Sequence, residues 1–164
     1  MKVVKLEPDD APEVEKFANR FYPPYFRLSQ YDIRYNLDRA ENKNCNFCFA
    51  LKDSGKILGY IMAWIDNTRV ANRREDVVVI DDIVVSPEAK GHYYDLLKAV
   101  AHEMDFLGYM GYPVETVARK SAGDLLLSHG KVIARLGYEP ECKSEYYDST
   151  MRETMVWVRF TLIE

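Results

Sequence analysis

Apolar and polar residues are distributed along this chain in a way that predicts a series of strands and helices. Seven segments are short, apolar and rich in β-branched or aromatic residues, as is typical of strands: residues 2–8, 45–52, 57–66, 76–85, 112–118, 138–147 and 155–163. Four segments have helix signals, either apolar residues at three- and four-residue intervals or a capping residue at the start: residues 9–21, 29–40, 94–107 and 122–136. The order of these elements predicts an α/β (α+β) fold, in which helices flank both faces of a mixed, mostly antiparallel sheet.

Residues with special backbone preferences mark several element ends. Ser29 has a side chain suited to cap the second helix. The sequence DSGK at residues 53–56 predicts a tight turn between two apolar strands, and therefore an antiparallel hairpin. Gly108 and Gly137 follow the last apolar positions of the two later helices, where glycine commonly ends a helix.

Length and composition favour one soluble domain. The 164 residues are 48% apolar, which is enough for a single core, and we expect one domain over residues 1–164. The formal charge of −4 gives no general attraction to nucleic acid or to an anionic membrane. Because the sequence has no apolar run of roughly 20 residues and no signal-peptide pattern at its start, we expect no membrane segment and a cytoplasmic location.

Two further features suggest chemistry only weakly. Residues 67–76 contain Arg69, Arg73 and Arg74, and we interpret them as a solvated polar loop; a local nucleic-acid patch is the weaker alternative. Cys45 and Cys48 form a C-x-x-C pair inside a predicted strand, where a three-residue offset directs two side chains to opposite faces. We therefore expect no metal site and no disulfide framework.

Two motifs resemble the Gcn5-related N-acetyltransferase (GNAT) superfamily. The first is IDDIVVSPEAKG at residues 80–91, similar to the family's central strand, turn and phosphate loop. The second is VIARLGYEPE at residues 132–141, similar to a late helix that ends before the next strand. The resemblance extends through nearly the whole chain in element order, and it implies acetyl-CoA as the cofactor. The residues that it places at the cofactor are Ile83, Val84, Val85, Lys90, Gly91, His92, Tyr93, Tyr94 and Asp95.

The phosphate loop departs from the family pattern at two positions. That pattern is Arg or Gln, two residues, Gly, one residue, then Gly or Ala, and it falls here on Lys90, Tyr93 and Asp95. Backbone N–H groups at the start of a helix bind phosphate well. Asp95 favours the empty helix but opposes a bound phosphate. The loop therefore leaves two hypotheses open, a cofactor-binding enzyme and a module that has lost turnover.

The resemblance also implies a base and an acid. Asp82 or Asp81, on the central strand, could accept the proton of the attacking amine. Because adjacent strand residues face opposite sides, only one of the two can point into a cleft. Asp82 is preferred; the alternative for both is a structural role. The family's tyrosine acid falls here on Ile133 and its asparagine near Leu126, so we expect a substitute donor. The candidates are Tyr146, Tyr147, Ser128 and His129, of which Tyr147 is our choice.

The sequence thus predicts an N-acetyltransferase that joins acetyl-CoA and a primary amine by direct attack in a ternary complex. The alternative is an inactive acetyltransferase-like binding or regulatory module. The acceptor is expected to be a small-molecule or peptide amine, with a homodimer possible and nucleic acid disfavoured. The aromatic FYPPYF sequence at residues 21–26 lies where relatives shape the acceptor pocket, although we favour ordinary packing under a rigid loop.

Overall fold

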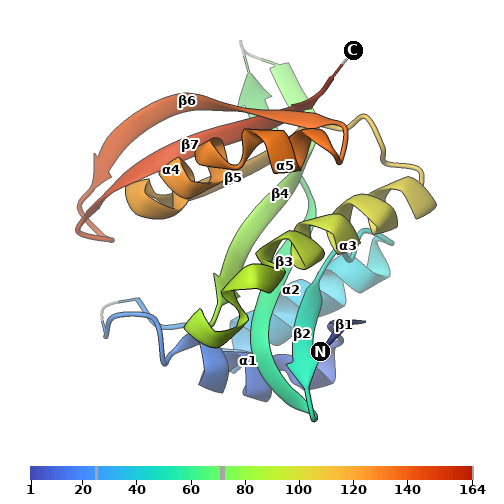
Figure 1. Ribbon diagram of the computed structural model, residues 1–164, viewed down its shortest axis with the longest axis vertical. Helices are drawn as coiled ribbons and strands as arrows, with labels where there is room; N and C mark the ends of the chain where they lie inside the picture. Colours follow the sequence, from blue (N-terminus) through green and yellow to red (C-terminus); the bar gives the residue numbers. More distant parts are fainter. Residues whose placement is uncertain (25, 71–72, 164) are drawn as a thin grey trace. The chain divides into compact units, whose positions relative to one another are not determined.

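The computed structural model describes residues 1–24, 26–70 and 73–163 (Figure 1). In this part of the chain the strands are β1 (Lys2–Lys5), β2 (Phe49–Asp53), β3 (Lys56–Val70), β4 (Arg73–Val85), β5 (Val114–Arg119), β6 (Tyr138–Asp148) and β7 (Glu153–Leu162). The α-helices are α1 (Ala11–Ala18), α2 (Gln30–Asn42), α3 (Tyr93–Phe106), α4 (Lys120–Ser128) and α5 (Gly130–Ala134). Two 3-10 helices, η1 (Pro8–Asp10) and η2 (Pro87–His92), precede α1 and α3.

The strands form one mixed sheet in the order β1-β2-β3-β4-β5-β7-β6. The pairs β1–β2, β2–β3, β5–β7 and β6–β7 are antiparallel. β4 and β5 are parallel, with Val78 opposite Val114 and Ile80 opposite Thr116. The predicted fold class, with a mixed and mostly antiparallel sheet, is confirmed. Their ladder ends at Ile80, although β4 continues to Val85.

The residues group into two compact units. Unit 1 comprises residues 1–64 and 82–108, and unit 2 comprises residues 65–81 and 109–164. In unit 1, α1 and α2 lie on one face of β2 and β3, and α3 lies on the other (Figure 1). Two contacts fix this arrangement. Phe17 of α1 packs edge-on against Tyr60 of β3, and Lys5 of β1 pairs with Glu103 of α3 at 2.9 Å.

The expected local signals are present in unit 1. The Ser29 hydroxyl accepts a hydrogen bond from the Tyr31 N–H at 3.2 Å and caps α2. The β2–β3 hairpin turns at Ser54 and Gly55, which both have positive φ (51° and 80°), as a two-residue hairpin turn requires. The helix predicted over residues 9–21 is shorter, because it begins as η1 and its α-helical part ends at Ala18.

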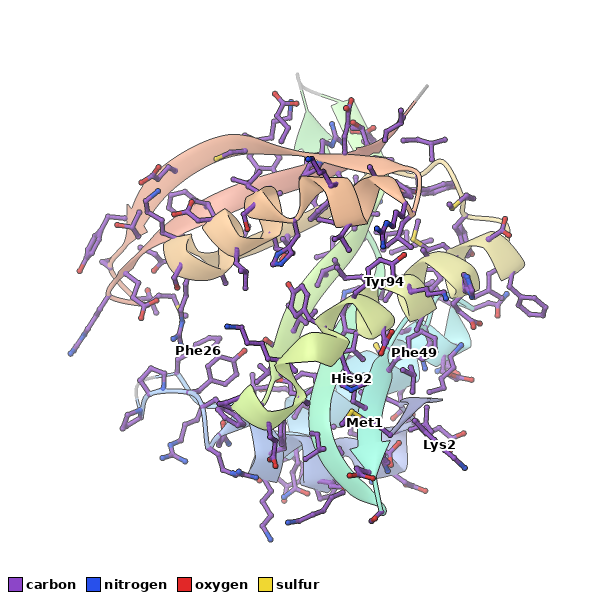
Figure 2. The ribbon with its side chains drawn as sticks, in the orientation of Figure 1. Met1, Lys2, Phe26, Phe49, His92 and Tyr94 are labelled. Carbon is purple, nitrogen blue, oxygen red and sulfur yellow. The ribbon has the colours of Figure 1, made fainter. Side chains whose placement is uncertain are left out.

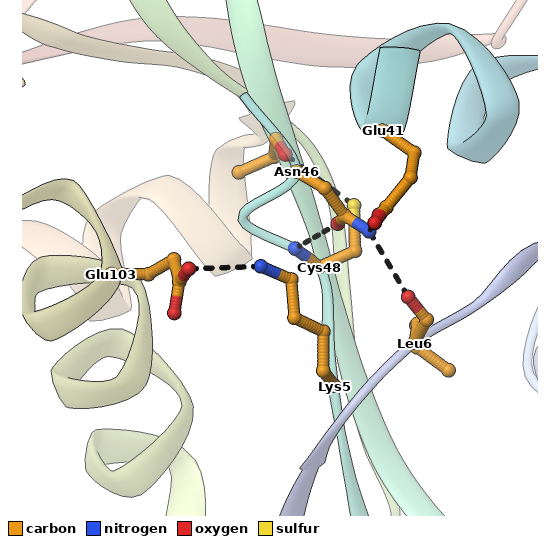
Figure 3. A network of polar contacts seen from close by, with 7 residues as sticks. Lys5, Leu6, Glu41, Asn46, Cys48 and Glu103 are labelled. Atoms are coloured by element: carbon orange, nitrogen blue, oxygen red, sulfur yellow. Dashed lines mark hydrogen bonds and ion pairs between the residues drawn. The ribbon is translucent and has the colours of Figure 1, made fainter. Parts of the chain in front are cut away.

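The strand predicted over residues 45–52 begins only at Phe49, so our argument from strand alternation at the two cysteines was wrong. The cause is Asn46, which is buried (Figure 3). Its side-chain N–H groups donate to the Leu6 carbonyl and to Glu41, and its oxygen accepts from the Cys48 N–H. These side-chain bonds accompany backbone bonds from the Phe47 N–H to the Ala63 carbonyl and from the Leu6 N–H to the Cys48 carbonyl, so the segment is hydrogen-bonded but irregular. Cys45 and Cys48 are buried, and the Cys48 thiol contacts the Ala63 carbonyl oxygen at 3.3 Å.

The polar loop predicted at residues 67–76 is mostly strand. β3 extends to Val70 and β4 begins at Arg73, while residues 71 and 72 lie outside the described part of the chain. The interpretation as a loop is therefore wrong for residues 67–70 and 73–76, which are strand, although Asn67 and Asp76 are exposed as expected. A long two-stranded segment replaces it.

In unit 2, α4 and α5 pack on one face of β5, β7 and β6 (Figure 1). Gly123 brings α4 close to β7, since a Cβ atom at this glycine would lie 1.9 Å from a methyl group of Val156. The helix predicted over residues 122–136 is interrupted at His129. There the Ser128 hydroxyl and the His129 ring both contact the Leu125 carbonyl at 2.7 Å, in competition with the helix backbone.

Candidate active site

The candidate site begins at the end of β4, where Asp82 accepts hydrogen bonds from two tyrosines. The Tyr22 hydroxyl donates to one carboxylate oxygen of Asp82, and the Tyr60 hydroxyl donates to the other. Tyr60 comes from the middle of β3, and Tyr22 from the connection between α1 and α2. All three residues belong to unit 1, and we call them the Asp82 cluster.

The two tyrosines of the Asp82 cluster differ in burial. Tyr60 is 0% exposed, and its ring lies against Phe17 at a centroid distance of 6.0 Å. Tyr22 is only half-buried, and its ring lies edge-on to Phe26 at a centroid distance of 5.0 Å. Phe26 is labelled in Figure 2. Tyr60 is therefore a fixed part of the core, whereas Tyr22 lies at its margin.

The Tyr60 hydroxyl remains protonated and acts as a donor. Burial raises the pKa of Tyr60 well above its usual range, and the negative charge of Asp82 raises it further. Both effects disfavour the phenolate. Asp82 is thus a carboxylate whose direction is fixed by neutral hydroxyl donors.

Asp81 differs from its neighbour. Its side chain is exposed, whereas that of Asp82 is half-buried, as expected for adjacent residues of a strand. Asp81 also belongs to unit 2 and Asp82 to unit 1. These environments are consistent with our preference for Asp82.

After β4 the chain turns at Ser86 into η2 and continues directly into α3. The Ala89 N–H donates to the Ser86 carbonyl at 3.0 Å, and the Tyr93 N–H donates to the Lys90 carbonyl. Some of the loop amides are therefore used inside the 3-10 turn. Lys90 and Gly91 are exposed, and the space beside Gly91, where a Cβ would lie, is open.

Asp95 in the first turn of α3 has a specific partner. Its carboxylate lies 2.9 Å from Nδ1 of His92, and both side chains are nearly half exposed. The contact directs part of the acidic charge toward the His92 ring. We expected Asp95 only to oppose a bound phosphate, and the contact with His92 is a second effect on the local charge. Nearby, burial raises the pKa of Tyr93 above its usual range, so its hydroxyl stays neutral.

These residues fit a phosphate group. The 14-residue helix α3 directs the positive end of its dipole to this point, and Lys90 adds a cation. The family pattern has a glycine at the position of Tyr93. In this chain Gly91, two residues earlier, leaves the backbone open instead. The strand end, Ile83–Val85, is half-buried beside β3.

Gly59 of β3 permits the close packing of this strand end. A Cβ there would lie 3.1 Å from the Val84 carbonyl oxygen and 3.3 Å from the Val85 Cα. The Ser86 N–H also donates to the Leu58 carbonyl at 2.9 Å. The end of β4 is therefore held against β3 up to the point where η2 begins.

The proposed acid lies in unit 2. Tyr147 is on β6 opposite Thr154 and is 67% exposed. The side chains of Ser128 and His129 make local helix contacts, and Ile133 is buried in the core. The role of Tyr147 stays a prediction.

Sequence reasoning missed the hydroxyl groups that hold Asp82. Tyr60 was grouped with the apolar residues of its strand, and Tyr22 with an aromatic segment whose member Tyr25 lies outside the described residues. One signal was available. A tyrosine in a central apolar strand usually needs a partner for its hydroxyl, and the next strand contains only two acidic residues in its apolar part.

Known proteins resemble this chain in sequence pattern and in fold. A model of the acetyltransferase (GNAT) family matches residues 11–109, and no curated protein matches the chain in sequence. Among solved structures, the fold is similar to the ribosomal-protein-S18-alanine N-acetyltransferase from Escherichia coli, with 18% identity, a TM-score of 0.64 and coverage of 99% of this chain and 94% of that chain.

Two further structures have the same fold with bound coenzyme A derivatives. The diaminobutyrate acetyltransferase from Paenibacillus lautus, in complex with L-2,4-diaminobutyric acid and coenzyme A, has 16% identity, a TM-score of 0.68 and coverage of 98% of this chain and 95% of that chain. The GNAT-like decarboxylase GphF, in complex with isobutyryl-CoA, has 14% identity, a TM-score of 0.69 and coverage of 98% and 99%. At these identities the structures show the fold alone.

The family model covers α1 to α3, and with them the Asp82 cluster, η2 and the start of α3. It matches more than half of the chain, and the solved structures share the fold over nearly its full length. This chain belongs to the acetyltransferase (GNAT) family.

Proposed function

We propose that this protein is an N-acetyltransferase that transfers an acetyl group from acetyl-CoA to a primary amine, by direct attack of the amine in a ternary complex. The observation that carries the proposal is Asp82, a held carboxylate on β4 that lies a few residues before a phosphate-binding segment. The solved neighbours with coenzyme A and with an amine substrate support the choice of both substrates.

Each part of unit 1 has a role in this proposal. Lys90, Gly91 and the first turn of α3 would hold the phosphate groups, with His92, Tyr93, Tyr94 and Asp95 around them. Ile83–Val85 would continue the cofactor site along β4. When bound, acetyl-CoA supplies an acetyl group that is activated as a thioester. The protein contributes mainly by positioning the amine, which can account for much of the rate of a two-substrate transfer.

Asp82 accepts the proton that the amine must lose. The Tyr60 hydroxyl fixes the direction of the carboxylate, so that the base is already oriented when the amine arrives. Tyr147 is our proposed donor for the leaving group.

The acceptor is expected to be a small molecule or a peptide, and a homodimer is compatible with the chain. Within the described residues, no helix is long and apolar enough to cross a membrane. We propose a cytoplasmic location and no role for nucleic acid, in keeping with the net charge of −4.

A thiol-release assay with acetyl-CoA and a panel of primary amines and peptides tests the proposal. We expect release of free coenzyme A that depends on the amine, together with acetylated product detected by mass spectrometry. Consumption of an acyl-CoA without any acetylated amine would contradict the proposal, and would direct attention to other acyl-CoA chemistry of the kind named for GphF.

A further inference from the structure

The two hydrogen bonds that Asp82 accepts from Tyr22 and Tyr60 differ in how easily they can be replaced, although the two tyrosines also contact each other. The bond from Tyr60 comes from a residue that is wholly buried in β3. The bond from Tyr22 comes from a half-buried residue that lies beyond the end of α1. A ligand can therefore compete with Tyr22 for Asp82 far more readily than it can compete with Tyr60.

The connection that carries Tyr22 is closed at its base. The side chain of Asn19 donates to the Leu28 carbonyl and accepts from the Leu28 N–H, each at 2.9 Å. Within this closed loop the Tyr22 ring packs on Phe26, which comes from the same loop. A rotation of the Tyr22 side chain can thus release the carboxylate while the ends of the loop remain in place.

The surroundings suit a positively charged ligand. Asp82 supplies a carboxylate, and the neighbouring side chains supply aromatic rings, which attract cations through their faces.

We infer that Tyr22 is the exchangeable partner of Asp82, and that the primary ammonium group of the acceptor takes its place on the carboxylate, while Tyr60 keeps the carboxylate oriented. This inference rests on the proposed function and extends it. It states that the acceptor is recognised in its charged form, and it assigns Tyr60 as a positioning residue and Tyr22 as a specificity-determining one.

The exchange needs no change of protonation. The Tyr22 hydroxyl leaves Asp82 and bonds to water, and an N–H of the ammonium group donates to the same carboxylate oxygen. A charged donor forms a stronger hydrogen bond to a carboxylate than a phenol does, so the exchange is favourable when the amine is held nearby.

The experiment is an NMR titration of the isotope-labelled protein with n-butylammonium, followed at the backbone signals of β4. Neutral n-butanol is the control for charge. The variants are Tyr22→Phe, Tyr60→Phe and Asp82→Asn. Tyr31→Phe on α2, which removes a hydroxyl from a side chain that is 79% exposed, is the matched control. The titration is performed without acetyl-CoA, so its result does not depend on turnover.

We expect n-butylammonium to bind Tyr22→Phe roughly threefold to tenfold more tightly than the wild type, because the competing donor is gone. Tyr31→Phe should equal the wild type, Tyr60→Phe should bind no more tightly than the wild type, and Asp82→Asn and n-butanol should show no saturable shift. Unchanged or weaker binding by Tyr22→Phe would overturn the inference, as would equal tightening in Tyr60→Phe. If Tyr60→Phe does not fold, the comparison of Tyr22→Phe with Tyr31→Phe still decides.

The outcome is separable from that of the proposed function. If the protein releases no coenzyme A in the thiol assay but its variants bind n-butylammonium in the expected order, the ammonium site stands and the proposed acetyl transfer is contradicted. If the protein acetylates amines but Tyr22→Phe binds n-butylammonium no more tightly, the acetyl transfer stands and the exchange at Asp82 is contradicted. A kinetic readout completes the design, since Tyr22→Phe should lower the KM for the amine more than it changes kcat.

Discussion

Asp82 is the residue on which most of the proposed chemistry depends, because two hydroxyl groups orient its half-buried carboxylate. Two tyrosine hydroxyls donate to it, one from the core and one from the margin of unit 1. Such a carboxylate is oriented before a substrate binds, which reduces the reorganisation needed during proton transfer.

Replacing Asp82 by Asn tests its role as the proton acceptor. Asn has nearly the same shape but cannot act as a base, so kcat should fall by about a hundredfold or more, while the affinity for acetyl-CoA changes little. Steady-state kinetics with an identified amine and calorimetry with acetyl-CoA measure the two effects. Asp81→Asn, at the exposed neighbour, is the matched control. An equal loss of activity in both variants, with reduced folding, would favour a structural role for the pair.

Asp95 allows a second test at the residue scale. Its carboxylate contacts His92 and lies in the first turn of α3, where it stabilises the empty helix and opposes a phosphate. Asp95→Gly should tighten acetyl-CoA binding by about 0.5–1 kcal/mol, and should lower the free energy of unfolding by a similar amount. Calorimetry and urea unfolding measure these opposite effects. Weaker acetyl-CoA binding by the variant would mean that Asp95, or the His92 ring that it contacts, makes a favourable contact with the ligand.

At the scale of elements, the close packing of α4 on β7 depends on Gly123. Its missing Cβ would overlap a methyl group of Val156, so Gly123→Ala should destabilise the fold by about 1–3 kcal/mol. Gly130→Ala is the matched control, because its Cβ would lie 3.9 Å from the nearest atom, in Pro140, and it should be neutral or stabilising by up to about 1 kcal/mol.

A double variant makes this test specific. Adding Val156→Ala to Gly123→Ala removes the overlapping methyl group, and part of the lost stability should return. Denaturant unfolding of the wild type, Gly123→Ala, Gly130→Ala and the double variant provides the comparison. If Gly123→Ala is as stable as Gly130→Ala, the close approach of α4 and β7 is not a constraint on the fold.

The elements also show what the sequence could and could not predict. Local signals such as Ser29 and the DSGK turn acted as expected, since each depends on neighbouring residues only. The strand at residues 45–48 failed because the Asn46 side chain reaches Leu6, which is 40 residues away in sequence. The Tyr60–Asp82 contact was missed for the same reason, because it depends on how two strands lie next to each other. Tertiary contacts of this kind leave little trace in local periodicity.

At the scale of the whole molecule, β3 and β4 contain residues of both units. We propose that residues 1–164 nevertheless form one cooperative domain, because unfolding either unit would break strands that the other unit also uses. The chain has two tryptophans, Trp64 in unit 1 and Trp157 in unit 2. The variants Trp64→Phe and Trp157→Phe each leave one fluorescent reporter.

Each single-tryptophan variant should show the same urea midpoint by fluorescence as by circular dichroism. Circular dichroism of each variant reports the whole chain and controls for any stability change that the substitution causes. A fluorescence midpoint that differs from the circular dichroism midpoint of the same variant would indicate that the units unfold separately.

Calorimetric titration of the wild-type protein with acetyl-CoA tests the central claim most directly, because every proposed role at η2 and α3 requires this ligand. The account predicts saturable binding at one site per chain, with coenzyme A competing for it. The contradicting result is no heat of binding at about 1 mM acetyl-CoA, together with no protection of the protein against thermal unfolding. The binding free energy would then be less favourable than about −4 kcal/mol. Such a result would contradict the assignment of this chain as an acetyl-CoA-dependent enzyme.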